Sequence, residues 1–306
     1  MAEHALVTGA AGTIGREVVG ELVRRGFEVD AWDIVEPAAG PAVNPARIDL
    51  GRSVADPPGK NYRFVAHLAS CTENRDDRST LGDHLSTVAM TVNLLEALGP
   101  TPPGVVCVTS SQLVYGPGEN SPDESATVAA RTAFAAAKLA SEAFLEAYGY
   151  RSGAPTVAFR LSNVVGPSTG RGVIHDFVRR AAQTPGGSAV RITGATRHRR
   201  SFLTIRDCAR AMVRHALDTD RKGHEVVNVA NHDSVSIADI ADIISGVTGV
   251  PFDVEKDSRS LAWAGDAGTV LPRIGRLTDA GWSPDATSRQ AVREAAEGHW
   301  KQRAAR

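Results

Sequence analysis

The stretch HALVTGAAGTIGREVVGELV, residues 4–23, decides how the chain folds. A short apolar run is followed by Gly9, Gly12 and Gly15 and then by the pattern of an amphipathic helix. In a strand–turn–helix unit, the first glycine allows a tight turn, the second lets a pyrophosphate approach the backbone, and the third lets the helix pack on the strand. The N–H groups of the first helical turn then face the phosphates. The motif predicts a dinucleotide cradle, although alone it also fits an ordinary glycine-rich turn.

The rest of the chain alternates between strand and helix patterns, which predicts right-handed βαβ units and a parallel sheet. The predicted strands are residues 4–8, 27–32, 46–50, 63–70, 104–109, 156–161 and 226–229. The predicted helices begin at residue 16 and then cover 84–98, 130–148, 172–183, 206–217 and 236–245, with one more helix at the C-terminal end. The expected fold class is α/β: a Rossmann-type doubly wound parallel sheet with a smaller C-terminal α/β substrate domain.

Composition narrows the function classes. The chain has 306 residues and a net charge of −1, so nothing indicates a nucleic-acid or membrane surface. The cysteines, Cys71, Cys107 and Cys208, are few and widely spaced, which favours a reducing compartment over a disulfide framework or a metal site. No basic leader or long apolar run precedes or interrupts the pattern, so we expect a cytoplasmic protein without bound metal.

An acidic residue follows the second predicted strand. Asp33 sits where a dinucleotide-binding fold places the acceptor for the adenosine ribose hydroxyls. Its charge would repel a 2′-phosphate, and no Arg follows it directly, so NAD is favoured over NADP. A plain loop aspartate is the alternative. We expect residues 1–161, with 205–230 returning to them, to form the NAD-binding domain, and residues 162–204 and 231–306 to form the substrate-binding domain.

The order of further motifs resembles the extended short-chain dehydrogenase/reductase superfamily, in its NAD-dependent epimerase/dehydratase branch, which includes nucleotide-sugar 4-epimerases. The resemblance covers nearly the whole chain. The matching stretches are Thr8–Gly15, Asp33, Asp49–Leu50, His67–Ala69, Asn93–Ala97, Ser110–Gly116, Lys138–Glu142, Arg160–Pro167, Arg200–Phe202 before Asp207, and Gly281–Pro284.

The resemblance implies site residues. Asp49 would bind the adenine amino group, Lys138 the nicotinamide ribose, and Ser111 the substrate hydroxyl that becomes a carbonyl. The implied cofactor-binding set is Gly9, Gly12, Thr13, Ile14, Gly15, Asp33, Asp49, Leu50, Leu68, Ala69, Ser70, Thr109 and Lys138. The implied substrate-binding set is Ser111, Gln112, Asn163, Arg200, which would bind a nucleotide phosphate, and Trp263. The resemblance also implies a homodimer formed through two helices of each subunit.

One departure from the family pattern concerns the catalytic acid–base. The family has Tyr four residues before the Lys, and this chain has Phe134, which carries no exchangeable proton. Three explanations stay open: an engineered Tyr→Phe change that traps a complex, a natural enzyme with another base, and a redox-silent NAD-binding scaffold. The side chains that could replace the phenol are Tyr115, Cys71, Glu73 and Glu119, each of which also has a plain structural or solvated interpretation.

Two more positions bear on the substrate. Trp263 stands where many nucleotide-sugar enzymes carry a diphosphate-binding Arg, and an indole cannot neutralise phosphate. Arg200, with Arg197 and Arg199, could compensate, or the indole could stack on a nucleoside-like group. Ser111 is followed by Gln112 rather than the Asp-Glu of 4,6-dehydratases, which favours an epimerase.

These features together predict an NAD-dependent sugar or nucleotide-sugar epimerase or dehydratase that works through a transient keto intermediate. An NAD-dependent dehydratase of a nucleoside-like substrate, using a base other than Tyr, is the alternative within the same class. A trapped variant or a silent scaffold is the alternative outside it.

Overall fold

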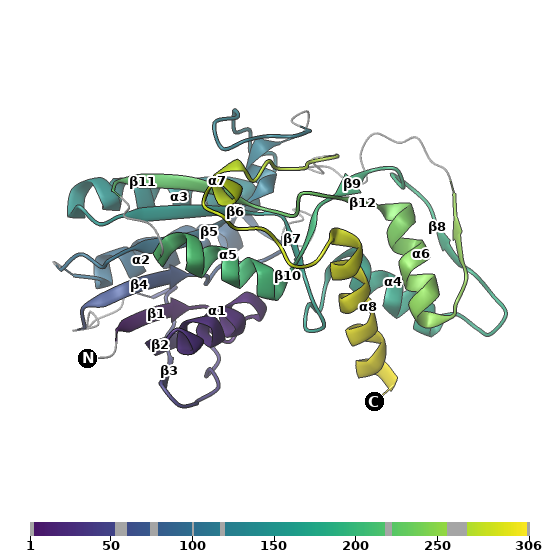
Figure 1. The fold of residues 1–306 in the computed structure, drawn as a ribbon, viewed down its shortest axis with the longest axis horizontal. Coiled ribbons are helices and arrows are strands. Elements are labelled where there is room, and N and C mark those ends of the chain that lie inside the picture. The colour runs from purple at the N-terminus through teal and green to yellow at the C-terminus, as the bar shows by residue number, and fades with distance from the viewer. Residues whose placement is uncertain are drawn as a thin grey trace.

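A seven-stranded sheet forms the centre of the molecule in the computed structural model (Figure 1). The structure describes residues 3–52, 60–73, 79–99, 101–116, 120–217, 222–255 and 268–304. The strand order is β11-β6-β5-β4-β1-β2-β3, and every pairing is parallel. The strands are β1 (His4–Thr8), β2 (Glu28–Asp33), β3 (Val43–Arg47), β4 (Tyr62–His67), β5 (Val106–Ser111), β6 (Thr156–Leu161) and β11 (His224–Val229). This doubly wound order confirms the predicted α/β class.

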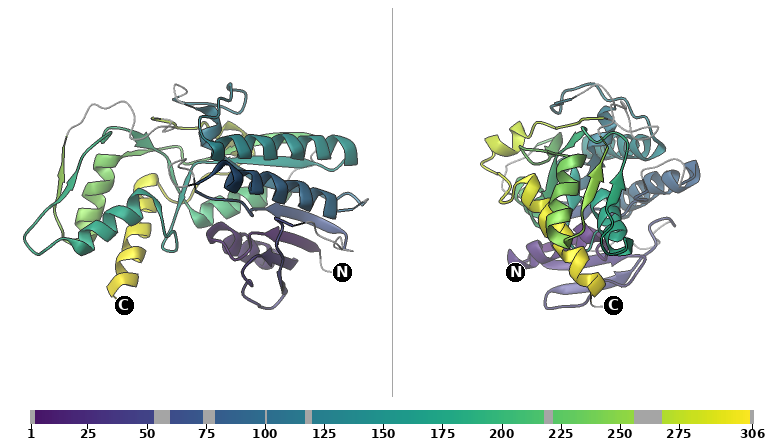
Figure 2. Two further views of the ribbon diagram at one scale, coloured as in Figure 1. Left: turned by 180° about the vertical axis from the view of Figure 1, so that it is seen from behind. Right: turned by 90° about the vertical axis from the view of Figure 1, so that its right-hand side faces the viewer.

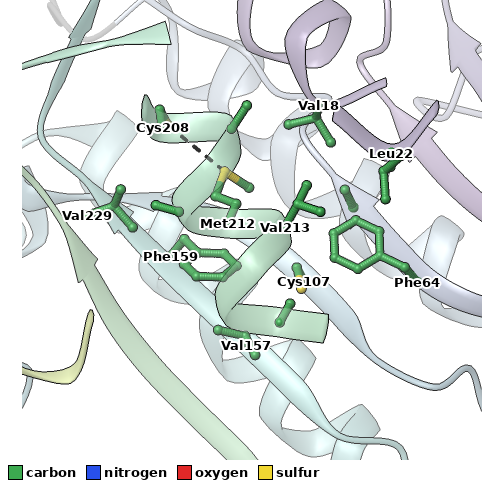
Figure 3. Packing of buried hydrophobic residues seen from close by; sticks show 14 of the residues in the cluster. Val18, Leu22, Phe64, Cys107, Val157, Phe159, Cys208, Met212, Val213 and Val229 are labelled. Atoms are coloured by element: carbon green, nitrogen blue, oxygen red, sulfur yellow. Dashed lines mark hydrogen bonds between the residues drawn. The ribbon is translucent and has the colours of Figure 1, made fainter. Parts of the chain in front are cut away.

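Helices cover both faces of the sheet. On one face, α1 (Thr13–Arg24) and α5 (Ile205–Leu217) pack on the strands, with Val18, Met212 and Phe159 in a fully buried cluster (Figure 3). On the other face lie α2 (Leu81–Ala97) and α3 (Ala133–Ser152), which run side by side (Figure 2, left). Because side chains alternate along a strand, neighbouring residues of each strand enter opposite clusters and the strands are apolar on both faces.

A third cluster lies beyond the carboxyl edge of the sheet (Figure 1). It is formed mainly by α4 (Gly172–Gln183), α6 (Ile237–Thr248) and α8 (Ser288–Ala304). A capping box at Ser236 begins α6, as the sequence predicts. The remaining elements are η1 (Gln112–Tyr115), β7 (Asn163–Val165) paired with β10 (Phe202–Thr204), β8 (Val190–Ile192) paired with β13 (Phe252–Val254), β9 (Arg199–Arg200) paired with β12 (Val235–Ser236), and α7 (Gly275–Asp279).

The predicted strand at 46–50 is wrong in position. The strand is β3, from Val43 to Arg47, and it pairs with β2 along its whole length. It is a half-exposed edge strand with little apolar character, whereas the residues that suggested a strand, Ile48 and Leu50, belong to the turn after it. Asp49 and Leu50 therefore follow the carboxyl end of β3 instead of ending a strand.

No helix in the described ranges is long and apolar enough to cross a membrane. Within the same ranges, no group of three or more His, Cys, Asp or Glu side chains is arranged to hold a metal ion.

Candidate active site

The glycine loop between β1 and α1 is shaped by close backbone contacts. Gly9 has φ +68°, and a Cβ there would lie 2.7 Å from the Ala69 nitrogen. A Cβ on Gly15 would lie 2.1 Å from the Gly9 carbonyl oxygen. Gly12 caps α1 without a side-chain hydrogen bond, so N–H groups of the first turn have no side-chain acceptor there. These residues fit a pyrophosphate, because the backbone N–H groups at the start of α1 are not covered by side chains of the loop glycines and can donate to an anion.

Asp33 at the end of β2 reaches back to this loop. The Ala11 N–H donates to Asp33 Oδ2 at 2.9 Å, and the Val35 N–H donates to Oδ1 at 3.2 Å. Each carboxylate oxygen keeps a further lone pair, so the side chain can orient the loop and still accept from a ribose. The bond to Ala11 is a role that the sequence pattern does not reveal.

Asp49 and Leu50 lie next to Asp33, beyond β3. Asp49 is exposed and accepts from the Gly51 N–H at 2.9 Å, whereas Leu50 is buried. Asn93 of α2 donates its side-chain N–H to the Leu50 carbonyl oxygen at 2.8 Å. The turn that carries the implied adenine-binding residues is thus fastened to α2.

A buried polar network joins the sheet to α2 and α3. His67, at the end of β4, is hydrogen-bonded through Nδ1 to Thr8 Oγ1 at 2.7 Å and through Nε2 to Thr91 Oγ1 at 3.2 Å. Thr91 Oγ1 is in turn 3.0 Å from Ser141 Oγ on α3. Burial, with a contribution from the Lys138 charge, lowers the pKa of His67 to about 3, so the imidazole is neutral near pH 7. The network holds Leu68 and Ala69, which follow His67, against the glycine loop.

Lys138 and Phe134 lie one turn apart at the start of α3. The helix begins after Thr132, whose hydroxyl accepts from the Ala135 N–H at 3.1 Å. Lys138 is 6% exposed, and its ammonium lies 5.8 Å from the centroid of the Phe134 ring. Burial lowers the pKa of Lys138 to about 8; a thiolate at Cys71 opposes this shift, and the Arg171 charge adds to it. A buried cation therefore stands beside a phenyl ring that has no proton to exchange.

Ser111 is the last residue of β5, and η1 follows it directly. The Ser111 hydroxyl accepts from the Leu113 N–H at 3.2 Å, while Gln112 and Thr109 are buried. Tyr115 donates its phenolic hydrogen to Asn228 Oδ1 at 2.7 Å, and its ring stacks on the Arg160 guanidinium at 4.9 Å. This phenol is fully buried with a structural partner on β11, and burial raises its pKa, which argues against a role as base.

The loop after β4 carries Ser70, Cys71 and Glu73. The Cys71 N–H donates to Thr87 Oγ1 at 2.9 Å, and the thiol is partly exposed. Arg171, just before α4, donates to the Thr72 carbonyl oxygen and interacts electrostatically with Glu73 and Cys71. Arg171 is a residue that sequence reasoning missed; the only signal was a basic side chain directly before the predicted helix at 172–183.

The other implied substrate residues come from the second half of the chain. Asn163, which opens β7, donates to the Ser201 carbonyl oxygen at 2.9 Å. Arg200 in β9 is half-buried and pairs with Val235 of β12. Trp263 and Glu119 lie outside the described residues. The described structure thus ties the loop of Cys71 to Thr87 on α2 and to Arg171 before α4, whereas Tyr115 points its hydroxyl toward β11.

Comparisons with known proteins agree with this geometry. A model of the family described as "NAD dependent epimerase/dehydratase family" matches residues 5–230. A "Putative UDP-glucose 4-epimerase" of Methanocaldococcus jannaschii is 24% identical and is aligned over 94% of this chain and 95% of its own. A crystal structure of UDP-galactose 4-epimerase superposes with a TM-score of 0.84 at 28% identity, covering 98% of this chain and 99% of that one. The structure of MoeE5 with UDP-glucose and NAD gives 0.83 at 26% identity, covering 99% and 100%.

Proposed function

We propose, from the premise that the chain belongs to the NAD dependent epimerase/dehydratase family, that it oxidises a hydroxyl group of a nucleotide sugar transiently and epimerises the carbon through the keto intermediate. The observation that carries this proposal is the pairing of an intact glycine cradle with the buried ammonium of Lys138 at the same edge of the sheet. Solved relatives hold UDP-glucose and NAD, which supports the substrate class and the cofactor.

The cofactor roles are assigned along the carboxyl edge of the sheet. The bare first turn of α1 binds the pyrophosphate, Asp33 accepts from the adenosine ribose, and Asp49 binds the adenine. Lys138 donates to the nicotinamide ribose, and Leu68, Ala69, Ser70 and Thr109 line the ring. NAD, when bound, supplies an acceptor for a hydride. The neutral His67 network keeps the cradle and the helix that carries Lys138 in register.

The substrate roles are assigned to residues at the carboxyl ends of β5 and β6 and beyond. Ser111 donates to the hydroxyl that becomes a carbonyl, with Gln112 and Asn163 alongside, while Arg200 and Trp263 bind the nucleotide portion. In this assignment residues 162–204 and 231–306 hold the substrate, and residues 1–161 with 205–230 hold the cofactor. Phe134 cannot take the hydroxyl proton, so another group of this chain must do so.

We assign a homodimer to the outer face of α2 and α3. Leu81 and Leu85 on α2, and Phe144 and Tyr150 on α3, are large apolar or aromatic side chains left exposed. The two helices that carry them are neighbours (Figure 2, left). Large apolar side chains exposed on adjacent helices are typical of an interaction surface. Two such faces meeting about a two-fold axis would bury each other.

The test is turnover of defined nucleotide sugars. Purified protein with NAD is incubated with UDP-glucose, UDP-N-acetylglucosamine or UDP-glucuronic acid, and proton NMR follows the C4 epimer while absorbance follows reduced nicotinamide. We expect an epimer from one of the sugars. If wild type makes none while Phe134→Tyr does, the chain is a silent or trapped member of the family, which is the second function that Phe134 favours. Light scattering of the wild type and of Leu85→Glu tests the dimer.

A further inference from the structure

Three charged or nucleophilic side chains from distant parts of the chain lie near one another. Cys71 follows β4, Lys138 lies on α3, and Arg171 precedes α4. The Cys71 N–H is bound to Thr87 of α2, and Thr91, one turn further along α2, lies 3.0 Å from Ser141 of α3, three residues after Lys138. These contacts place the loop of Cys71 beside the turn of α3 that carries Lys138, and electrostatic interactions of Cys71 with the Lys138 and Arg171 charges agree with this placement. Proposed cofactor and substrate roles alone do not explain why a thiol stands between two cations.

The loop that carries Cys71 is fixed on both sides. Its own N–H is bound to Thr87 Oγ1 at 2.9 Å, which ties it to α2. The next carbonyl, that of Thr72, accepts from the Arg171 guanidinium, which ties it to the beginning of α4. The thiol is partly exposed, whereas Cys107 and Cys208 are fully buried in the core. Cys71 is thus a positioned and reachable thiol.

Lys138 provides a second and independent observation. Lys138 is 6% exposed. Within the described residues its ammonium has no hydrogen-bond acceptor and lies near only the Phe134 ring and charged groups. A buried ammonium without an acceptor is costly unless an anion or a polar ligand satisfies it. The neighbouring group that becomes an anion by losing one proton is the Cys71 thiol.

The geometry points to Cys71 and Lys138 as the proton-transfer pair of this enzyme, acting where a Tyr–Lys pair acts in its relatives. This inference rests on the proposed function. In the reactive state of the proposed pair, the Cys71 sulfur is free to accept one proton while Lys138 keeps its own. As the hydride leaves the carbinol carbon for NAD, the substrate O–H bond breaks and its proton forms the S–H bond of Cys71, so that the pair holds two protons beside a ketone. Return of the hydride reverses both transfers.

Other titratable groups near Phe134 fit this role less well. His84 packs its ring edge-on to Phe134 at 6.2 Å, but its Nδ1 is buried away from solvent and its Nε2 is bound to Ser79. Glu73 interacts with the Arg171 charge and is thus engaged as a partner of that guanidinium. Cys71 is the one of the three that the Lys138 charge acts on directly.

The first experiment measures turnover. Cys71→Ala should lower kcat by on the order of 10²–10⁴, the usual contribution of a positioned base. Cys71→Ser, which keeps the size but holds no negative charge near pH 8, should lose as much. Adding Phe134→Tyr to Cys71→Ala should restore turnover, because the phenol re-creates the pair with Lys138. Full turnover in Cys71→Ala would overturn the inference, and so would a failure of Phe134→Tyr to rescue a folded double variant.

The second experiment needs no substrate. Iodoacetamide is applied to the folded protein at several pH values, and mass spectrometry locates the label; the buried Cys107 and Cys208 serve as internal controls. Because the thiolate is the nucleophile, Lys138→Met and Arg171→Gln should each slow alkylation of Cys71 several-fold, and the remote Arg24→Gln should leave it unchanged. Equal rates in all variants would refute the pair. A wild type without turnover would instead refute the proposed function and leave this measurement valid.

Discussion

The glycine cradle and the first turn of α3 face the same edge of the sheet, but they tolerate change very differently. In the cradle, the backbone of Gly9 lies against that of Ala69, and the backbone of Gly15 lies against that of Gly9. Neither glycine therefore leaves space for a Cβ. At the start of α3, Lys138 is fixed by the helix that carries it, while the ring of Phe134 contributes only packing beside it. In the function proposed above, cofactor binding therefore depends on backbone shape, whereas proton transfer depends on a single side-chain atom.

The largest expected effect is a loss of folding stability when His67 is protonated, because His67 lies in the network that connects the two regions. Because His67 is neutral in the fold with a pKa near 3 and has an ordinary pKa of 6.5 when unfolded, the unfolded chain binds the extra proton first. Stability should fall as the pH drops from 6.5 to 3, by up to about 5 kcal/mol from this residue. Urea denaturation at pH 7 and pH 4.5 measures it. His67→Gln should show a smaller loss over that interval, and equal losses would contradict the assignment.

The next effect tests the cradle. Gly15→Ala places a Cβ 2.1 Å from the Gly9 carbonyl oxygen, so the turn must open. We expect a loss of about 3 kcal/mol in unfolding free energy and at least about 100-fold in NAD affinity by calorimetry. Gly20→Ala on the same helix is the control, because its Cβ meets only Arg24 Nη1 at 3.5 Å and Ala favours helix. Normal NAD binding by Gly15→Ala would mean that the cradle is not shaped by this contact.

The third effect is a gain in stability, similar in size to the loss expected for Gly15→Ala. Lys138 is charged below a folded pKa of about 8, against an ordinary value of 10.5, so burial of its charge opposes folding below pH 8. Lys138→Met should therefore raise stability at pH 7 by about 3 kcal/mol while weakening NAD binding. The gain should shrink between pH 8 and 10.5 in denaturation experiments. Destabilisation at pH 7 would show that the interaction with Cys71 outweighs the burial of the ammonium.

The smallest expected effect returns to the cradle. Asp33→Ala removes the acceptor of the Ala11 N–H and the charge that disfavours a 2′-phosphate. We expect a loss of about 2 kcal/mol in stability from the charge-assisted bond and a lower preference for NAD over NADP. Binding of both dinucleotides is measured side by side, with Asp253→Ala, which removes an exposed carboxylate of β13 outside the proposed cofactor site, as the control. An unchanged preference would assign Asp33 to loop support alone.

The sequence predicts most of this fold because its signals are local. The apolar runs of β1, β4 and β6 and the caps at Thr132 and Ser236 are complete within a few residues. The edge strand β3 is misplaced because it is half-exposed and takes its conformation from pairing with β2. Arg171 is invisible to such reasoning because its acceptor, the Thr72 carbonyl, lies 99 residues away along the chain. The partners of Tyr115 and Asp33 are likewise set by tertiary packing.

The anchoring of α3 has a consequence for how this protein could have diverged. The helix is held by the Thr132 cap, the Ser141–Thr91 bond and a two-fold hydrogen-bonded ion pair between Arg160 and Glu142 at 2.7 and 3.0 Å. None of these contacts uses the side chain at position 134. Codons for Phe and Tyr differ by one base, so a single mutation can exchange phenyl and phenol there without disturbing the Lys. Relatives with Phe and relatives with Tyr at position 134 would share one scaffold and differ in which side chain accepts the substrate proton.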